Sequence, residues 1–509
     1  MSDLASRRPN PDQPPSQRSA RRSRRPLIQV TDEDADEDRW TRLRRLARTG
    51  IPGLMSSLAF HALLLLVMAL IVVSLDRPPT LPPIELGWIV ERPEPEIVET
   101  DVPVIRIPSM QLPQAAPPER PDEPEASEPA VPSESRDEPP PVVPVPVDNL
   151  LEIRREALQE NGPAGHDADV IAAIRRSLDW FARQQQSDGR WQLEGPYPDG
   201  ITQSRFRADT GATALALLCF AGAGQTHQDG DYVETVSSGL DWLLAAQKRS
   251  GEIFERTEIG LEPRFYAHSQ ATIVLCELLV LTGDESLREP ATQAVRFLLE
   301  SQNPERGGWR YHQLTATGEG DVSVTGWALM ALHSARMADI DIPAETWFLA
   351  SQFLDSAQEH PGNAAFYKYR PSFPMNRDQR LSMTAEGLLC RQWLGWPRNF
   401  PALQRGVAFL TDEQNHPVWD NGRRNVYAWY YVAQTLHNLG GPGWDDWFAR
   451  AAPLLVARQV KSGRSRGSWH PHRPPGSPHE WSQVVGRLYF TAMCTLILET
   501  PFRHRSVYE

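Results

Sequence analysis

Six glutamines recur at nearly regular intervals through the last two-thirds of this 509-residue chain, and each lies in the same local pattern. Successive glutamines are 62, 55, 56, 56 and 45 residues apart. An aromatic residue or a leucine precedes each glutamine by five positions, and a second apolar segment follows it. A period near 55 residues that contains two helical patterns predicts a protein built from repeated helical hairpins. The glutamines are Gln185, Gln247, Gln302, Gln358, Gln414 and Gln459.

The two helices predicted for each unit differ in polarity. The first has apolar residues at helical spacing on one side, as in Ile171, Ile174 and Leu178. The second is apolar all round, as in residues 212–221, and is therefore expected to be buried inside the first. No capping repeat is evident, so a closed ring is favoured over an open solenoid. We predict an all-α (α/α)6 toroid with repeats near 170–225, 232–283, 290–338, 344–396, 402–440 and 445–500.

A charge-free segment lies upstream of the repeats, at residues 51–75. It is long enough to cross a hydrocarbon core of about 30 Å. Residues 1–50 are expected to be a disordered basic arm. Five arginines lie shortly before the segment and one follows closely, which predicts that this arm is cytoplasmic. A cleaved signal peptide is the alternative, but the 50-residue leader and the absence of a small-residue cleavage pattern oppose it.

Residues 76–150 contain 20 prolines and 16 acidic residues, a composition that predicts a disordered, extended linker. The toroid, residues 151–509, would then be displayed on the periplasmic or other extracytoplasmic side of the cytoplasmic membrane. It carries 35 basic and 41 acidic residues, which argues against nucleic acid as a partner. Its four cysteines all lie in second apolar segments without a CxxC pair, which favours buried free thiols, although a disulfide stays possible outside the cytoplasm.

The first and third units contain a recognisable motif. They read Trp180-Phe181-x3-Gln185-x3-Gly189-x-Trp191 and Phe297-Leu298-x3-Gln302-x4-Gly307-x-Trp309. This pattern resembles the glutamine–tryptophan repeat of squalene and oxidosqualene cyclases, which prenyltransferase β subunits share more loosely. The other units are degenerate, with Trp419 and Trp469 displaced in the fifth and sixth. The resemblance implies a terpenoid cyclase-like toroid in which these glutamines and tryptophans are structural.

The segment Asp321-Val322-Ser323-Val324-Thr325 matches the place of the family's catalytic motif. The resemblance implies an Asp-x-Asp-Asp-Thr proton donor in class II cyclases and an Asp-x-Cys zinc site in prenyltransferases. Ser323 stands at the position of the acid and of the zinc-binding cysteine. A serine hydroxyl cannot protonate an alkene and is a poor zinc ligand. We therefore predict loss of both the catalytic acid and the zinc ligands, and no cofactor.

Residues leading into the second helices are expected to surround the mouth of the central cavity. Weak catalytic candidates there are Asp209, His268 and Asp321, of which Asp209 and Asp321 could instead be helix N-caps. Binding candidates are Tyr266, Trp327, Arg380, Tyr427, Trp429 and Arg487, with Tyr489 beside them. His470, His472 and His479 are weak metal candidates, but their proline-rich loop favours surface histidines, and no metal is predicted.

Three function classes follow from these residues. The first is a ligand-binding or scaffolding module that takes an isoprenoid, another apolar ligand or a protein partner. The second is an enzyme acting on envelope polysaccharide, because acids, arginines and aromatic side chains suit glycans. The third is a divergent terpenoid or prenyl enzyme with an acid that the motif does not reveal.

Overall fold

The computed structural model describes residues 149–158, 168–195, 197, 204, 206–254, 262–360 and 363–508. The chain divides into two compact units, residues 1–125 and 126–509, and every described residue belongs to the second. The predicted cytoplasmic arm, membrane span and almost all of the linker lie outside the described residues and stay predictions.

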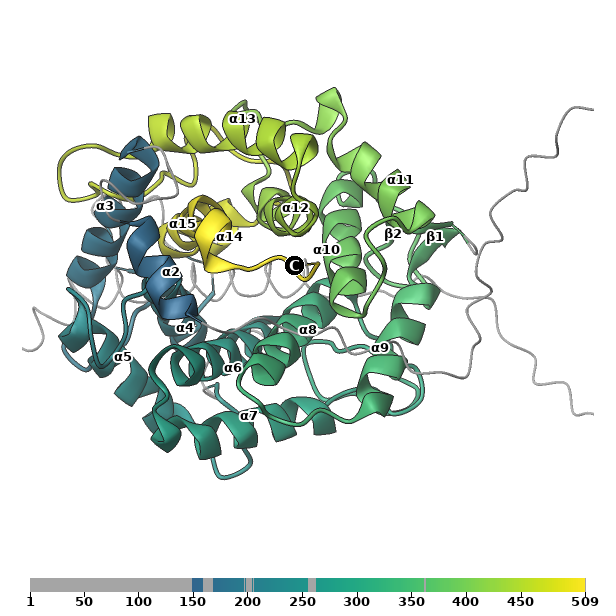
Figure 1. The fold of residues 1–509 in the computed structure, drawn as a ribbon, viewed down its shortest axis with the longest axis horizontal. Helices are drawn as coiled ribbons and strands as arrows, with labels where there is room; N and C mark the ends of the chain where they lie inside the picture. The colour runs from purple at the N-terminus through teal and green to yellow at the C-terminus, as the bar shows by residue number, and fades with distance from the viewer. Residues whose placement is uncertain are drawn as a thin grey trace, which may run out of the picture. The chain divides into compact units, whose positions relative to one another are not determined.

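Twelve long helices form two concentric rings (Figure 1). The inner ring consists of α4 (Asp209–Gly222), α6 (Glu262–Thr282), α8 (Val322–Met337), α10 (Arg380–Trp393), α12 (Val426–Leu439) and α15 (Arg487–Arg503). The outer ring consists of α3 (Ala168–Gln184), α5 (Val233–Ala246), α7 (Arg288–Glu300), α9 (Ala344–Ser356), α11 (Pro401–Leu410) and α13 (Pro442–Arg458). Each outer helix precedes its inner partner, so the chain forms six hairpins.

The ring is closed by contacts between its first and last hairpins. Helix α15 packs against α4, and α13 packs against α3. The predicted (α/α)6 toroid is therefore confirmed for the described residues. Closure gives every inner helix two inner neighbours, which removes the need for capping repeats.

Burial explains why the inner helices are apolar on every side. All residues of α4 are buried, whereas α3 buries only the face that carries residues such as Ile171 and Ile174. Within the described residues one helical stretch, Arg264–Thr282 of α6, has the length and hydropathy of a membrane span, but most of it is buried in the ring. All four cysteines are buried free thiols, as predicted.

The recurring glutamines join successive hairpins, which confirms their structural role in four units. The Gln185 amide donates hydrogen bonds to the carbonyl oxygens of Gly189 (2.8 Å) and Thr235 in α5 (2.9 Å). Gln247 and Gln302 make the equivalent bond to the next outer helix. Gln459 does so to Ala173 in α3, across the closure of the ring.

The tryptophan of the repeat holds the loop between the two helices. The Trp191 indole N–H donates to the Phe181 carbonyl (2.8 Å), and the Trp309 indole bonds the Leu298 carbonyl in the same way. Trp469 makes the equivalent bond to Leu455 (2.8 Å). Trp469 is therefore displaced in the sequence but not in the structure, because the longer loop after Gln459 accommodates the extra residues.

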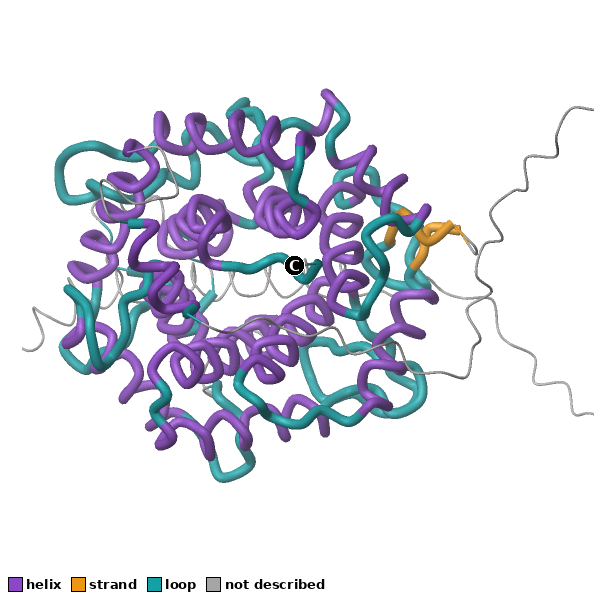
Figure 2. The backbone as a smooth tube through the Cα atoms, in the orientation of Figure 1, coloured by secondary structure: helices purple, strands orange, loops and turns teal. Residues whose placement is uncertain are grey.

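The fourth and fifth units depart from this pattern. Helix α9 ends at Ser356, so Gln358 falls in a short strand and bonds Asp355 instead. That strand, β1 (Gln358–His360), pairs antiparallel with β2 (Asn363–Tyr367), the orange element of Figure 2. Gln414 lies in a short 3-10 turn, η3 (Glu413–Asn415), and is exposed. Two further short elements are η2 (Glu285–Leu287) and α14 (Ser482–Val485).

One end of the ring is covered by α2 (Leu150–Ala157). Arg154 of α2 donates to the carbonyls of Ala221 and Arg503, at the C-terminal ends of two inner helices. It also pairs with Glu277 (3.0 Å), which binds the side chain of Arg503 as well (2.7 Å). The last residues of the chain lie over the same end (Figure 1). The N-terminal ends of the inner helices are at the opposite end.

Candidate functional site

A cavity of about 300 Å³ lies where the inner helices begin. Its wall consists of the first turns of all six inner helices and of the loops before them. Aromatic and aliphatic side chains dominate this wall, and the volume is at the lower end of the range for small-molecule sites, about 300–1,000 Å³. The main lining side chains are Phe206, Tyr266, Tyr311, Trp327, Tyr369, Met383, Tyr427, Trp481 and Tyr489.

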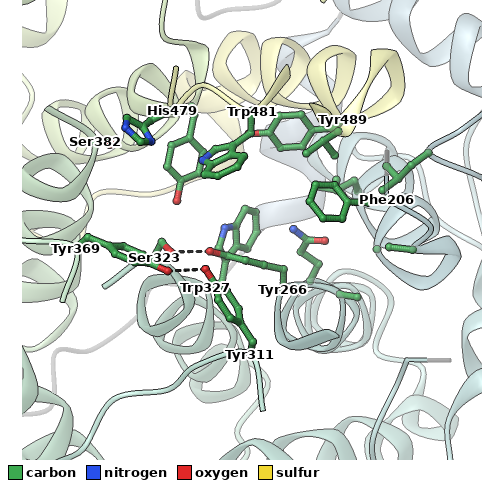
Figure 3. Close-up of a pocket in the computed structure, with 18 of the residues that line it drawn as sticks. Phe206, Tyr266, Tyr311, Ser323, Trp327, Tyr369, Ser382, His479, Trp481 and Tyr489 are labelled. Atoms are coloured by element: carbon green, nitrogen blue, oxygen red, sulfur yellow. Dashed lines mark hydrogen bonds between the residues drawn. The ribbon is translucent and has the colours of Figure 1, made fainter. Parts of the chain in front are cut away.

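A hydrogen-bonded chain runs from the cavity wall to a buried acid. The hydroxyls of Tyr266 and Ser323 are 2.6 Å apart, as drawn in Figure 3. Ser323 in turn donates to Asp321 Oδ1 at 2.9 Å. Tyr266 comes from α6 and Ser323 from α8, so the packing of two adjacent inner helices creates this chain.

Asp321 is both the N-cap of α8 and a polar group behind the cavity. Its Oδ1 accepts from the Val324 backbone N–H at 2.8 Å, which is the N-cap role expected as an alternative. Its Oδ2 lies 3.7 Å from an Arg310 nitrogen. Burial raises the pKa of Asp321 to about 6, although the hydrogen bonds from Val324 and Ser323 and the charge of Arg310 oppose this shift. Asp321 is thus a carboxyl that changes protonation near neutral pH.

A second buried acid, Glu386, escaped the sequence analysis. It lies on α10, is fully buried, and its Oε2 accepts a hydrogen bond from the Tyr427 hydroxyl at 3.3 Å. Burial, reinforced by the nearby Asp321 carboxyl, raises the pKa of Glu386 well above its ordinary value. The sequence did contain a signal for this buried acid: Glu386 lies near the middle of a predicted inner helix, three residues after Met383, and all sides of such a helix are expected to be buried.

The predicted binding residues divide into two groups. Tyr266, Trp327 and Tyr427 line the cavity, as does Tyr489. The other three do not. Trp429 packs against Trp419, with ring centroids 6.3 Å apart. Arg487 and Arg380 are bound to groups outside the cavity: Arg487 donates to Ser468 (2.9 Å), and Arg380 pairs with Glu359 (2.7 Å).

None of the three catalytic candidates lies in the cavity wall, where they were expected: Asp321 lies behind it, next to Ser323, and the other two are bound elsewhere. His268 has both ring nitrogens at backbone groups, the N–H of Ile253 (3.1 Å) and the carbonyl of Ala294 (3.0 Å). Burial lowers the pKa of His268 to about 4, so it is a neutral structural residue. Asp209 is buried beside Arg190 (3.2 Å) at the start of α4.

The three histidines of the sixth loop do not gather around one point. His479 lines the cavity mouth and lies within hydrogen-bonding distance of Asn376 (3.2 Å). The ring of His470 instead accepts from the backbone N–H of His472. In the part of the chain that the structure describes, no three His, Cys, Asp or Glu side chains are placed to hold a metal ion.

Comparisons with known proteins relate this arrangement to a family. Residues 157–270 match the squalene-hopene cyclase C-terminal domain. Human lanosterol synthase is 32% identical over 151 residues, which are 29% of this chain and 19% of that protein. Mouse lanosterol synthase is 31% identical over 154 residues, again 19% of its length. The chain thus spans about a fifth of the curated relatives that it matches.

These matches support a relation between this part of the chain and the terpenoid cyclase-like superfamily. The family match includes α3, α4 and α5, where the first glutamine–tryptophan repeat lies.

Solved structures with a similar fold include enzymes of different activities. The type II terpene cyclase MstE from Scytonema is 15% identical, with a TM-score of 0.41, and the match covers 66% of this chain and 99% of that one. An alpha-amylase from Clostridium perfringens is 12% identical, with a TM-score of 0.45 and coverage of 65% and 97%.

Proposed function

We propose that this terpenoid cyclase-like toroid is a binding module that holds an apolar, isoprenoid-type ligand in its aromatic cavity. The lining of the cavity carries this proposal. Aromatic faces and aliphatic side chains form most of the wall, and such a surface gains free energy by contact with hydrocarbon rather than with a hydroxyl-rich sugar. The glycan-acting alternative has no comparable support in the cavity.

The residue at the position of the family acid supports binding over cyclisation. Ser323 lines the cavity where the resemblance requires the proton donor. Its hydroxyl is hydrogen-bonded to Tyr266 and Asp321 and cannot protonate an alkene. A cavity that retains its shape without this acid can bind an isoprenoid without cyclising it.

We further propose that the module works outside the cytoplasmic membrane, held by the predicted span at residues 51–75 and the proline-rich linker. The described chain begins at Asn149, next to α2, at the end of the ring opposite the cavity mouth. We therefore expect the cavity mouth to accept a ligand, or a protein partner, at the end of the ring away from α2.

Organic extraction of the full chain purified from its own cells, followed by mass spectrometry, tests the binding proposal. We expect a co-purifying polyprenyl, hopanoid or sterol-like compound at close to one per chain. Ala267→Leu, which places a larger side chain in the cavity wall, should lower this occupancy several-fold, because packed interiors tolerate added volume poorly. Ala449→Leu, on the exposed face of α13, is the matched control. An empty wild-type cavity would contradict the proposal.

A second candidate, a divergent isoprenoid-processing enzyme, is favoured by one observation. Asp321 is an acid with a raised pKa, connected through Ser323 to the cavity wall, and such groups concentrate at catalytic sites. Turnover of an isoprenoid that disappears in Asp321→Asn would support this candidate over a pure binding module.

A further inference from the structure

Glu386 differs from the other buried glutamates in having no cationic partner. Four glutamates are buried among the described residues, and the other three lie within 4 Å of an arginine. These are Glu277 (3.0 Å from Arg154), Glu480 (2.7 Å from Arg424) and Glu499 (3.8 Å from Arg503). Burial of a carboxyl group without such a partner is costly. Among the described residues no ion pair offsets this unfavourable free energy of burial, so we expect the Glu386 carboxyl to have another role.

The position of Glu386 connects it to the cavity. Ser382 and Met383 line the cavity, and Glu386 follows them by four and three residues on the same face of α10. Tyr427, another lining residue, donates its hydroxyl hydrogen to Glu386 Oε2 at 3.3 Å. Tyr431 donates to the Tyr427 hydroxyl at 3.2 Å. These three side chains therefore form a hydrogen-bonded chain whose middle member, Tyr427, belongs to the cavity wall.

The neighbouring helix makes room for this carboxyl. A Cβ atom at Gly326 of α8 would lie 2.1 Å from Glu386 Oε1, so only glycine fits opposite it. Glycine inside a helix costs about 1 kcal/mol relative to alanine. Gly326 directly precedes Trp327, which lines the cavity. Oε1 itself has no hydrogen-bond partner among the described residues.

We propose that the Tyr431–Tyr427–Glu386 chain is a specificity site that recognises one oxygen atom, a hydroxyl or a carbonyl, on an otherwise apolar ligand. This inference rests on the proposed binding function and narrows the ligand class from hydrocarbons to isoprenoid alcohols and ketones. The hydroxyl of Tyr427 accepts from Tyr431 and can turn its own hydrogen toward Glu386 or toward the cavity. It can therefore accept from a ligand hydroxyl or donate to a ligand carbonyl.

The protonation state of Glu386 fits recognition better than alkene protonation. Burial raises its pKa well above the ordinary value, which favours the neutral carboxyl, and a neutral carboxyl adds a donor to the chain. A carboxylic acid with a raised pKa is a weak acid, whereas protonation of an alkene demands a strong one. The group is suited to hold an oxygen atom in place without reacting with the hydrocarbon.

A binding comparison with two probes tests this assignment. The full chain, exchanged from detergent into amphipol, is titrated with the C15 alcohol farnesol and with the C15 hydrocarbon that lacks its hydroxyl, and empty amphipol corrects for partitioning. We expect wild type to bind the alcohol about tenfold more tightly, since one satisfied buried hydrogen bond has an effect of this order. Glu386→Leu and Tyr427→Phe should each reduce this preference to twofold or less, with hydrocarbon affinity retained. Glu386→Gln, which keeps a donor and an acceptor, should preserve most of it.

Tyr430→Phe is the matched control, because Tyr430 is a buried tyrosine of the same helix whose hydroxyl contacts Met330 Sδ instead. It should leave the preference unchanged. Equal binding of the two probes by wild type, or an alcohol preference that survives both Glu386→Leu and Tyr427→Phe, would overturn the specificity site while the binding module stands. If the alcohol preference were lost in Tyr266→Phe instead, the specificity site would also be overturned, because the ligand oxygen would then bind beside Tyr266 and Ser323. Binding of neither probe would contradict the proposed function itself.

Discussion

Asp321 carries a structural and an electrostatic role that oppose each other. As the N-cap of α8 it satisfies a backbone N–H, which stabilises the helix. As a fully buried carboxyl it loses hydration, and its pKa rises from 3.8 to about 6. The native state therefore binds this proton more tightly than the unfolded chain does. The contribution of Asp321 to the free energy of unfolding is most favourable below about pH 4 and declines as the pH rises to about 6.

Asp321→Asn should separate these two roles. Asparagine retains the cap but carries no charge, so the variant should be more stable than wild type at pH 7 by roughly 1–3 kcal/mol. The difference should vanish below about pH 3, where Asp321 is protonated in both states. Urea unfolding followed by circular dichroism between pH 3 and 7 measures it. The same exchange at Asp412, an exposed cap of η3, controls for the removal of a charge. A variant less stable than wild type at pH 7 would contradict the burial argument.

The glutamine ties join each outer helix to the unit before it. Three of the four satisfy a carbonyl group in the loop and another in the next outer helix, whereas Gln302 satisfies only the latter. The tie of Gln459 also closes the ring, because its amide donates to Ala173 of α3 (2.8 Å) and Gly467 (3.0 Å). Its side-chain oxygen accepts from Arg176.

Gln459→Leu should therefore lower the free energy of unfolding by about 1–3 kcal/mol, since two buried carbonyls lose their donor. Gln414→Leu, at an exposed glutamine of the same sequence series, should change it by less than about 0.5 kcal/mol. Equilibrium denaturation of the two variants checks the difference. Equal effects would show that position in the repeat, rather than the hydrogen bonds, determines stability.

At the scale of the whole molecule, the two ends of the ring have opposite character. One end holds the aromatic cavity, whereas the other is closed by α2 through the Arg154, Glu277 and Arg503 cluster. Although burial opposes ionisation, the charges of Arg503 and Arg154 lower the pKa of Glu277. Its contribution to stability is therefore present above the ordinary glutamate pKa and is lost as the pH falls below it.

Arg154→Met should destabilise the toroid by about 3–5 kcal/mol at pH 7, because it removes one partner of a buried ionic cluster. The loss should shrink in acid as Glu277 becomes protonated. Arg155→Met, on the same helix, removes an ion pair with the exposed Asp229 and should cost about 1 kcal/mol. Thermal unfolding of both variants at pH 7 and pH 4 tests this. A loss at Arg154 no larger than that at Arg155 would show that α2 is not needed to close the ring.

The fold was predictable because patterns among residues close together in the sequence specify it. Helical periodicity, the glutamine spacing and the all-round apolar second helices are properties of neighbouring residues, and they specified a closed ring of six hairpins before any contact was known. The capping possibility at Asp321 and the buried thiols followed from the same local reasoning. The repeat failed at Gln358 and Gln414, where the helix before each glutamine ends early, so that spacing alone does not decide which backbone groups the side chain reaches.

The repeat architecture followed from the sequence alone, which also predicts that Ser323 stands where the resembled family has its acid. Which side chains face the cavity depends on the tertiary structure. His268, Trp429 and Arg487 lie near the starts of inner helices, as Tyr266 and Tyr427 do, yet they point into the protein around the ring. Rotation of each inner helix about its axis sets this outcome, and it depends on packing against the helices around it. Glu386 escaped notice for the same reason: its lack of a cationic partner is a property of three helices together.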